Sequence, residues 1–405
     1  MAAHIRQYAE AIHETQSTLY ITPLRSLNRD LLKRIMWWSK ELDFDVSVRH
    51  GDTTQYERSM QAQNPPDLMI STPETLQAVL TGKIMRSHLA NIQFIVIDEV
   101  HELVASKRGV QLAAGLERLK KMIRKNLGKE PQIVCLSATV GNPKAVAGYF
   151  MDQPHIVNTE RGSMVSLFVE APTAYKKDES RIPPEVRARL DYIISEIEKR
   201  NSLLIFTNTR EAAERISSKI KSMRPDLSVQ THHSSLSKEL RLAAEDDFKA
   251  GKIKALICTS SLELGIDIGQ VDFIIQYNSP RQVSKMLQRV GRAGHRLDKT
   301  SEGVIITTGM DDAFESAVIA KLAMEGKIEP SRLYGKSLDV LAQQVVGMSM
   351  ETWKTPLKDI KDTLRTSRPF ASLTEKEVID TAMVMQRAGY GWLNYIKDGK
   401  ETIKT

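Results

Sequence analysis

The chain has 405 residues, of which 41% are hydrophobic and 26% are charged, and this length predicts about two or three domains that each bury a core. Such a composition excludes wholesale disorder, a collagen-like repeat and a coiled-coil rod. No run approaches the roughly 18 to 20 apolar residues that cross a bilayer, and the first 16 residues are polar. We therefore expect a cytoplasmic protein without a membrane partner.

Charge and cysteine content indicate which partners and which cysteine-based sites to expect. Lysine and arginine total 57 against 50 acidic residues, a net charge of +7, which permits a polyanionic partner without requiring one. Cys135 and Cys258 each lie in an apolar run, so we expect neither a disulfide framework nor a zinc site.

Short apolar runs alternate with amphipathic helical patterns, which is typical of parallel sheets connected by helices. The first predicted strands cover residues 17–22, 45–50, 67–72, 94–98 and 132–137. A second set covers residues 202–207, 228–233, 254–259, 273–278 and 303–308. The pattern predicts an α/β fold with a first lobe over residues 1–170, a polar, proline-containing linker at 171–184 and a second lobe over 185–327.

Helical patterns dominate after Lys327. Residues 328–405 should therefore form a small, mostly helical module. Ser337 is expected to cap the helix that begins at Leu338, and Thr374 and Glu377 have the spacing of a capping box.

An acidic pair ends the strand predicted at 94–98. Asp98 and Glu99 should lie at the carboxyl end of a parallel strand, where open α/β sheets bind ligands. Asp98 could hold Mg²⁺ through its water shell, and Glu99 could orient or deprotonate an attacking water. A simple strand cap is the alternative. Ser137 and Thr139 end the next strand, so their hydroxyls should face the same crevice.

Two glycine-containing segments stand out in the second lobe. Gly265 and Asp267 lie in TSSLELGIDIG, which suits a loop whose backbone approaches a ligand closely. The following QRVGRAGHR carries Gln288, Arg289 and Arg292, and guanidinium groups can reach phosphate oxygens with two parallel hydrogen bonds. A solvated basic helix is the alternative, although its glycines would be costly there.

The order of these motifs resembles that of superfamily 2 helicases: DEVH at 98–101, SAT at 137–139, IFTNTR at 205–210, TSSLELGID at 259–267 and QRVGRAGH at 288–295. HHSSLSKELRLAAEDDFKAGKIKALICTSSLELGIDIG, LQRVGRAGHR and SLDVLAQQVVGM are similar to the Lhr (large helicase-related) group. The resemblance extends from Thr22 to about Gly347. It implies two RecA-like lobes in tandem with a winged-helix-like module, ATP and Mg²⁺ as cofactors, and 3′-to-5′ unwinding driven by strand-stimulated ATP hydrolysis.

The resemblance also implies roles at the nucleotide site. Asp98 and Glu99 would serve Mg²⁺ and the attacking water, and His101 would link them to the rest of the site. Arg292 would be the arginine finger, a group worth about 10³- to 10⁵-fold in rate. His295 replaces the second arginine of many superfamily 2 members, as in the Lhr pattern. The remaining implied residues are coupling Ser137 and Thr139 and nucleotide-binding Gly265, Asp267, Gln288 and Arg289.

Nucleic-acid contacts should follow the family's strand-tracking motifs, whose hydroxyls, amides and arginines position a phosphate backbone without reading bases. The implied residues are Thr22, Pro23, Arg25, Gly51, Thr72, Thr207, Arg210, Thr259 and Ser260. Thr72 and Pro73 also make a good helix start, so a structural role is the alternative there. The expected partner is single-stranded or partly duplex nucleic acid, with DNA favoured over RNA.

The sequence contains no phosphate loop of the pattern G-x-x-x-x-G-K-[ST]. Its one Gly-Lys-Ser, at 335–337, follows no predicted strand. Three interpretations remain open: a helicase fragment that starts after the loop and stops before the Lhr C-terminal extension, an inactive nucleic-acid clamp, or one half of a split helicase whose loop is on another chain. We favour the first, and we expect this chain alone to hydrolyse ATP weakly or not at all.

Overall fold

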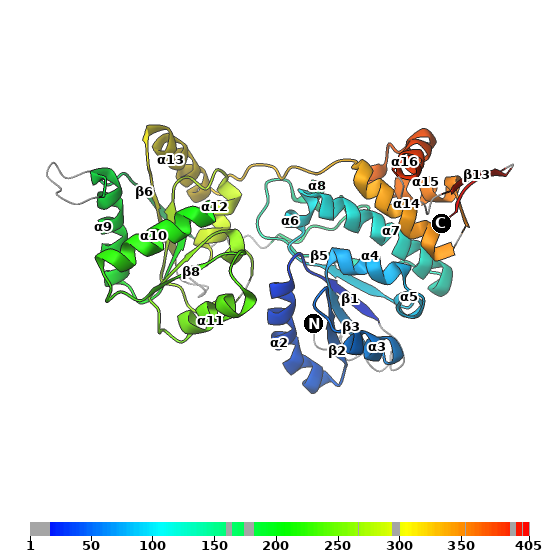
Figure 1. The fold of residues 1–405 in the computed structure, drawn as a ribbon, viewed down its shortest axis with the longest axis horizontal. Coiled ribbons are helices and arrows are strands. Elements are labelled where there is room, and N and C mark those ends of the chain that lie inside the picture. The colour runs from blue at the N-terminus through cyan, green and yellow to red at the C-terminus, as the bar shows by residue number, and fades with distance from the viewer. Residues whose placement is uncertain are drawn as a thin grey trace. The chain divides into compact units, whose positions relative to one another are not determined.

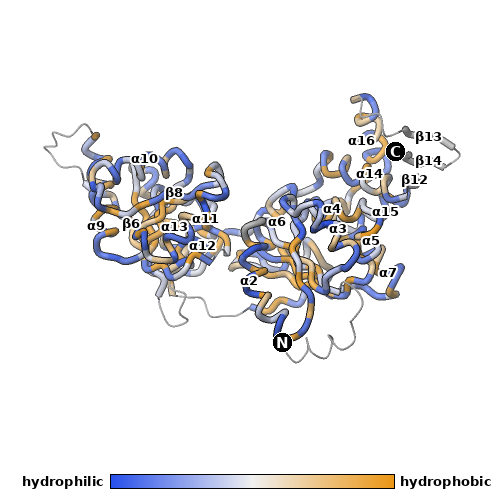
Figure 2. Tube along the Cα trace, turned by 60° about the horizontal axis from the view of Figure 1, so that its bottom comes forward, coloured by the Kyte–Doolittle hydropathy of each residue, from blue (hydrophilic) through white to orange (hydrophobic). Residues whose placement is uncertain are grey.

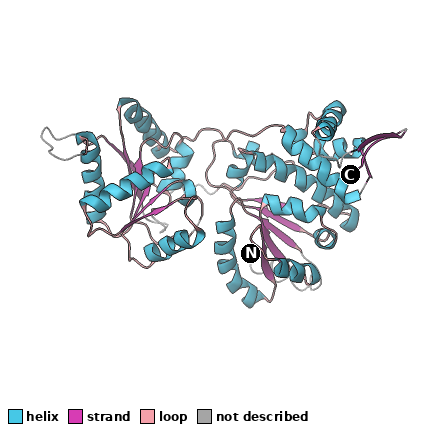
Figure 3. Cartoon of the chain, viewed as in Figure 1, coloured by secondary structure: helices cyan, strands magenta, loops and turns pink. Residues whose placement is uncertain are grey.

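The computed structural model describes residues 17–158, 164–173, 182–265, 267–293, 300–352, 354–388, 394–398 and 400–404. The chain divides into two compact units. The first contains Met1–Ala138, Asn142–Ile156 and Ser331–Thr405, and the second contains Thr139–Gly141 and Val157–Pro330. Each unit has a sheet with helices on it, as Figure 3 shows.

The sheet of the first unit is parallel and has the strand order β2-β3-β1-β4-β5. Its strands are β1 (Thr18–Ile21), β2 (Val46–Arg49), β3 (Leu68–Ser71), β4 (Phe94–Ile97) and β5 (Gln132–Cys135), which confirms the first predicted set. Helices connect them in the expected alternation (Figure 1). These are α2 (Arg25–Leu42), α3 (Gln55–Gln63), α4 (Pro73–Thr81), α5 (Ile84–Leu89), α6 (Val100–Val104) and α7 (Lys107–Leu127), and α8 (Pro143–Ala147) follows the last strand.

The sheet of the second unit has the order β6-β11-β10-β7-β9-β8 and is also parallel. The predicted strands are confirmed as β7 (Leu203–Phe206), β8 (Val229–His232), β9 (Ala255–Cys258), β10 (Phe273–Tyr277) and β11 (Ser301–Ile306). The helices are α9 (Pro184–Lys199), α10 (Arg210–Met223), α11 (Lys238–Lys249), α12 (Val283–Val290) and α13 (Met310–Met324). Strands β7, β9 and most of β10 and β11 are fully buried, because helices cover both faces of a parallel sheet. Figure 2 shows the hydrophobic residues of both sheets in orange.

The boundary between the lobes differs from the one predicted at residue 170. Strand β6 (Val165–Glu170) pairs in parallel with β11, so it belongs to the second sheet. Its pairing partner lies more than 130 residues later, and such a long-range contact leaves no signal in local composition. The polar stretch at 171–184 therefore connects β6 to α9 within the second unit and does not join the lobes. Residues 174–181 of that stretch lie outside the described residues.

The C-terminal module packs against the first lobe. Buried side chains of α7, including Val110 and Ala114, share one core with α14 (Leu338–Thr352), α15 (Leu357–Arg365) and α16 (Glu375–Arg387). The capping box of Thr374 and Glu377 is present. Ser337 immediately precedes α14, and its hydroxyl donates to Asp339 in the first turn of that helix. The module also contains an antiparallel sheet that the sequence did not predict, with β12 (Lys354–Pro356), β13 (Asn394–Asp398) and β14 (Lys400–Lys404).

Among the residues that the structure describes, no helix has both the length and the apolar character that crossing a membrane requires.

Candidate functional site

The acidic pair lies where β4 ends. Glu99 has a left-handed backbone conformation, with φ of 47°, so the chain turns sharply before α6 begins at Val100. Asp98 accepts hydrogen bonds from the hydroxyl of Tyr20 on β1 (3.1 Å) and from the backbone amide of Glu99 (2.9 Å). Burial and the neighbouring Asp98 raise the pKa of Tyr20 well above its usual range, so this phenol stays a donor that orients the carboxylate.

His101 connects the acidic turn to the neighbouring strand. Its Nδ1 atom lies 3.2 Å from the hydroxyl of Ser137, just after β5. Glu99 and Glu102 lie 3.5 and 3.6 Å from its ring nitrogens and would favour the charged form. Burial outweighs them and lowers the pKa of His101 to about 4. The neutral ring can therefore exchange hydrogen bonds with Ser137 at neutral pH.

Strand β5 is an edge of its sheet among the described residues. It pairs only with β4 there, and Val134 within the strand and Leu136 just after it are 39% and 41% exposed. Exposed apolar residues are unusual on a parallel sheet, which is normally covered on both faces. Ser137 and Thr139 are both exposed, and the boundary between the units falls between them.

Two predicted nucleic-acid residues occupy equivalent interior positions in the two lobes. Thr22 follows β1 and donates to the carbonyl of Leu24 (3.0 Å), and Thr207 follows β7 and donates to the carbonyl of Thr209 (2.9 Å). Both threonines are 0% exposed. Their hydroxyls therefore shape the turns into α2 and α10 and do not face solvent. Pro23, in the first of these turns, is also buried.

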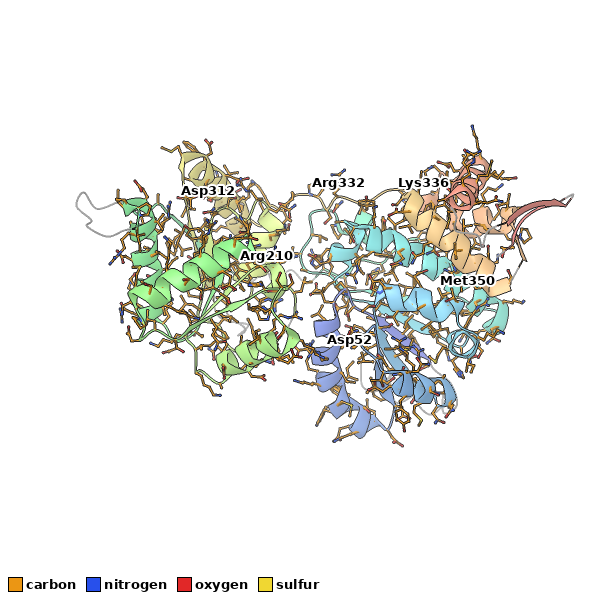
Figure 4. The ribbon with its side chains drawn as sticks, viewed as in Figure 1. Asp52, Arg210, Asp312, Arg332, Lys336 and Met350 are labelled. Atoms are coloured by element: carbon orange, nitrogen blue, oxygen red, sulfur yellow. The ribbon has the colours of Figure 1, made fainter. Side chains whose placement is uncertain are left out.

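The other predicted contacts fall into buried and exposed groups. Thr72 is 4% exposed and precedes α4 without the expected cap, because its hydroxyl pairs with that of Thr75 (3.2 Å). Arg210, labelled in Figure 4, is exposed and donates to the Ser235 hydroxyl (2.9 Å). Gly51 and Ser260 are exposed, and Thr259 is half-buried. The side chain of Arg25 lies outside the described part of the structure.

Arg289 lies inside the second unit and not on the surface of its helix. Its guanidinium forms an ion pair with Glu263, with Nε 2.6 Å from Oε1, and donates to Gln276 (2.5 Å). The two charged side chains are 4% and 7% exposed. The sequence signal predicted a nucleotide contact here, but the geometry makes Arg289 an internal support. The sequence did not single out Glu263 as a functional residue. The available signal was its position between two leucines, Leu262 and Leu264, which are buried, because a buried carboxylate needs a cation as its partner.

Arg292 is tied to the same acidic residue. Its Nη2 atom donates to the backbone carbonyl of Glu263 (2.7 Å), so the Glu263 side chain is held by one arginine and its carbonyl by another. Gly265 and Gln288 are half-buried, and exposed Asp267 accepts from the amide of Gly269 (3.0 Å). Gly294 and His295 lie outside the described residues.

The chemistry of Asp98 fits a hydrated Mg²⁺ ion. Within the described ranges, no group of three or more His, Cys, Asp or Glu side chains could hold a metal. Mg²⁺ commonly takes one or two carboxylates and fills its other positions with water and phosphate oxygens. A single oriented carboxylate therefore suits a cation that arrives with a nucleotide.

Comparisons with known proteins match both halves of the chain to helicase domains. Residues 1–146 match the DEAD/DEAH box helicase family and residues 185–296 match the helicase conserved C-terminal domain. ATP-dependent helicase Lhr-Core of Methanothermobacter thermautotrophicus is 36% identical over 82% of this chain and 40% of its own length. The Lhr-Core of Methanocaldococcus jannaschii is 36% identical over 95% of this chain and 45% of its own length.

A solved structure extends the likeness to three dimensions. The Mycobacterium smegmatis helicase Lhr, bound to single-stranded DNA and AMP-PNP, matches with a TM-score of 0.84 and 33% identity. The match covers 97% of this chain and 53% of that one. The chain thus spans about half or less of the relatives it matches. On this combination of motifs, fold and sequence identity, the chain belongs to the Lhr group of DEAD/DEAH-box helicases.

Proposed function

We propose that this chain forms the two motor lobes of an ATP-dependent, 3′-to-5′ nucleic-acid translocase that prefers single-stranded DNA. The observation that carries the proposal is the hydrogen bond between His101 and Ser137, which joins the acidic turn after β4 to the exposed segment after β5. The Nδ1 atom of the neutral His101 lies near both the Glu99 carboxylate (3.5 Å) and the Ser137 hydroxyl (3.2 Å), so a change at Glu99 would alter the contact with Ser137. Such a link couples hydrolysis to movement of the segment that leads into the second unit.

The acidic pair of the first lobe and Arg292 of the second unit would then have separate chemical roles. Asp98, oriented by Tyr20, would hold Mg²⁺ through its water shell, and the ion would supply charge neutralisation at the phosphates. Glu99 would orient and deprotonate the attacking water. Arg292 of the second unit would neutralise charge on the transferred phosphoryl group, its guanidinium positioned by the Glu263 carbonyl.

Strand contacts would come from exposed backbone and basic groups. Gly51, Arg210 and Ser260 are accessible, so we assign them to phosphate contacts. We assign Thr22 and Thr207 to positioning, because their hydroxyls are engaged inside the two turns. These assignments need no reading of bases, so binding would be independent of sequence.

The phosphate loop is the component that this sequence lacks. The edge of β5, with exposed Val134 and Leu136, is compatible with an added parallel strand that would deliver such a loop beside Ser137. Without it, the chain would act as a nucleic-acid clamp, and the same absence of a loop favours that second candidate function.

The test is ATP hydrolysis with and without single-stranded DNA. We measure it for the chain alone and for the chain extended at its N-terminus with a strand and loop of the G-x-x-x-x-G-K-[ST] pattern. We expect strand-stimulated hydrolysis only in the extended chain, abolished by Glu99→Gln. Hydrolysis that survives Glu99→Gln contradicts the mechanism. DNA binding without any hydrolysis in the extended chain supports the clamp.

A further inference from the structure

A buried polar cluster lies where three helices of the first unit meet. Helices α4, α7 and α14 pack against one another, and Figure 1 shows α14 alongside α7. At their meeting point lies Arg118 of α7, whose side chain is 3% exposed. Gln77 of α4 and Gln344 of α14 are 6% and 0% exposed. A charge so deeply buried is costly unless all its donors are paired.

All three nitrogen atoms of the Arg118 side chain donate to side chains of the other two helices. Its Nε and Nη2 atoms donate to the carboxylate of Glu351 on α14, with Nε 3.1 Å away. Its Nη1 atom donates to the side-chain carbonyls of Gln77 (3.1 Å) and Gln344 (2.8 Å). Gln344 in turn donates to Gln77 (2.8 Å), and Gln77 donates to the backbone of Gln111 (2.9 Å). One guanidinium of α7 thus bridges to both α4 and α14.

Two glycines leave room for this cluster. A Cβ on Gly115 would lie 2.2 Å from the Nε2 atom of Gln77, and a Cβ on Gly347 would lie 3.2 Å from the Nη1 atom of Arg118. Well-packed apolar side chains would stabilise such a contact at least as well as buried ions do. We therefore expect the cluster to contribute a defined geometry more than stability.

The position of α4 could affect nucleic-acid binding, because α4 begins next to Thr72, a predicted contact with the strand. Its first turn follows Thr72, and Glu74 in that turn forms an ion pair with Arg108 of α7 (Nη2 to Oε2, 3.0 Å). Gln77, one turn later on α4, reaches both Arg118 and α14. We propose that Arg118 is a positioning residue, which locks α4, whose first turn follows the predicted strand contact at Thr72, to the C-terminal helices through Gln77, Gln344 and Glu351. The strand-binding part of this inference rests on the proposed function.

Hydrogen exchange and strand affinity test the proposal in the full chain. Arg118→Met removes the buried cation of Glu351, which still pairs with the more exposed Arg86 (Nη2 to Oε2, 3.2 Å), and it leaves Gln77 and Gln344 without their shared donor. We therefore expect amides 76–81 of α4 and those of α14 to exchange about 100-fold faster. Affinity for single-stranded DNA should fall about tenfold. The matched control is Lys107→Met, which removes the exposed ion pair between Lys107 and Asp339 on the same two helices. It should change neither quantity by more than about twofold.

A conservative variant separates positioning from bulk stability. Arg118→Lys keeps a charge for Glu351 but cannot also serve both glutamines. We expect it to recover most of the resistance to urea while α4 exchange and strand affinity stay altered. If Arg118→Lys fully restored the resistance to urea, the α4 exchange rates and the strand affinity, Arg118 would serve only as an ion-pair partner of Glu351, and the proposal would be overturned.

Other outcomes remain decisive if Arg118→Met fails to fold. Gly347→Ala, whose methyl group would crowd Arg118, should speed α4 exchange to a smaller extent in a folded chain. Unchanged α4 exchange in both Gly347→Ala and Arg118→Lys would refute the lock. If the unaltered chain binds no DNA, the proposed function fails, and the exchange measurements still decide whether Arg118 couples α4 to α14.

Discussion

Replacing Arg289 by methionine tests whether this residue supports the second unit from inside or binds a nucleotide. The substitution keeps the apolar length of the side chain and removes the cation that faces Glu263. It also removes the donor to Gln276 and the guanidinium that lies 5.3 Å from the centre of the Phe206 ring. The carboxylate of Glu263, 7% exposed, would then be buried without this partner.

The expected cost follows from that burial. Breaking a buried ion pair by removing one partner costs about 3 to 5 kcal/mol, because the other charge stays desolvated. For a unit of this size, that corresponds to a fall in melting temperature of roughly 6 to 20 °C. The exposed pair of Arg281 and Glu315 in the same unit, with side chains 66% and 35% exposed, gives the comparison. Arg281→Met should cost about 0 to 1 kcal/mol.

Urea unfolding monitored by circular dichroism measures both variants. The double variant Arg289→Met, Glu263→Leu should recover much of the lost stability, since two apolar side chains can replace a buried pair. A loss in Arg289→Met no greater than in Arg281→Met would refute the reasoning. If the same variant also lost much of its nucleotide affinity, Arg289 would bind the nucleotide, as first predicted from the sequence.

Three further changes have outcomes that the structure specifies. Burial lowers the pKa of His101 from 6.5 to about 4. As the pH falls, His101 is therefore protonated in the unfolded chain before it is protonated in the folded one. The free energy of unfolding of the first unit should therefore fall by about 3 kcal/mol between pH 6.5 and 4. Urea unfolding at several pH values measures this, and an unchanged pH dependence in His101→Gln would contradict it. Arg210→Ala should reduce the slope of log affinity against log salt by about 0.7, measured with single-stranded DNA, and an unchanged slope would remove Arg210 from the phosphate contacts. Gly269→Ala, at a φ of 81°, should destabilise the second unit by about 1 kcal/mol in the same urea assay, whereas a neutral effect would mean that the loop tolerates another conformation.

The sequence by itself determined the repeating strands and helices and the order of the motifs. Each strand was readable because its apolar residues are consecutive, as in FIVI before Asp98 and ALIC before Thr259. Motifs that follow such strands must lie at the carboxyl edge of the sheet, whatever the rest of the chain does. The capping box at Thr374 is equally local, because its partners are three residues apart.

Only the tertiary structure decided which polar groups face solvent. Thr22 and Arg289 look like ligand contacts in the sequence, yet each side chain is buried and bonded to a partner within its own lobe. The partners of Arg118 are as much as 233 residues away, and the strand pairing of β6 reaches 136 residues along the chain, from Val165 to Ser301. Contacts of that range depend on how the chain folds back on itself, and local patterns of hydrophobicity and charge carry no record of them.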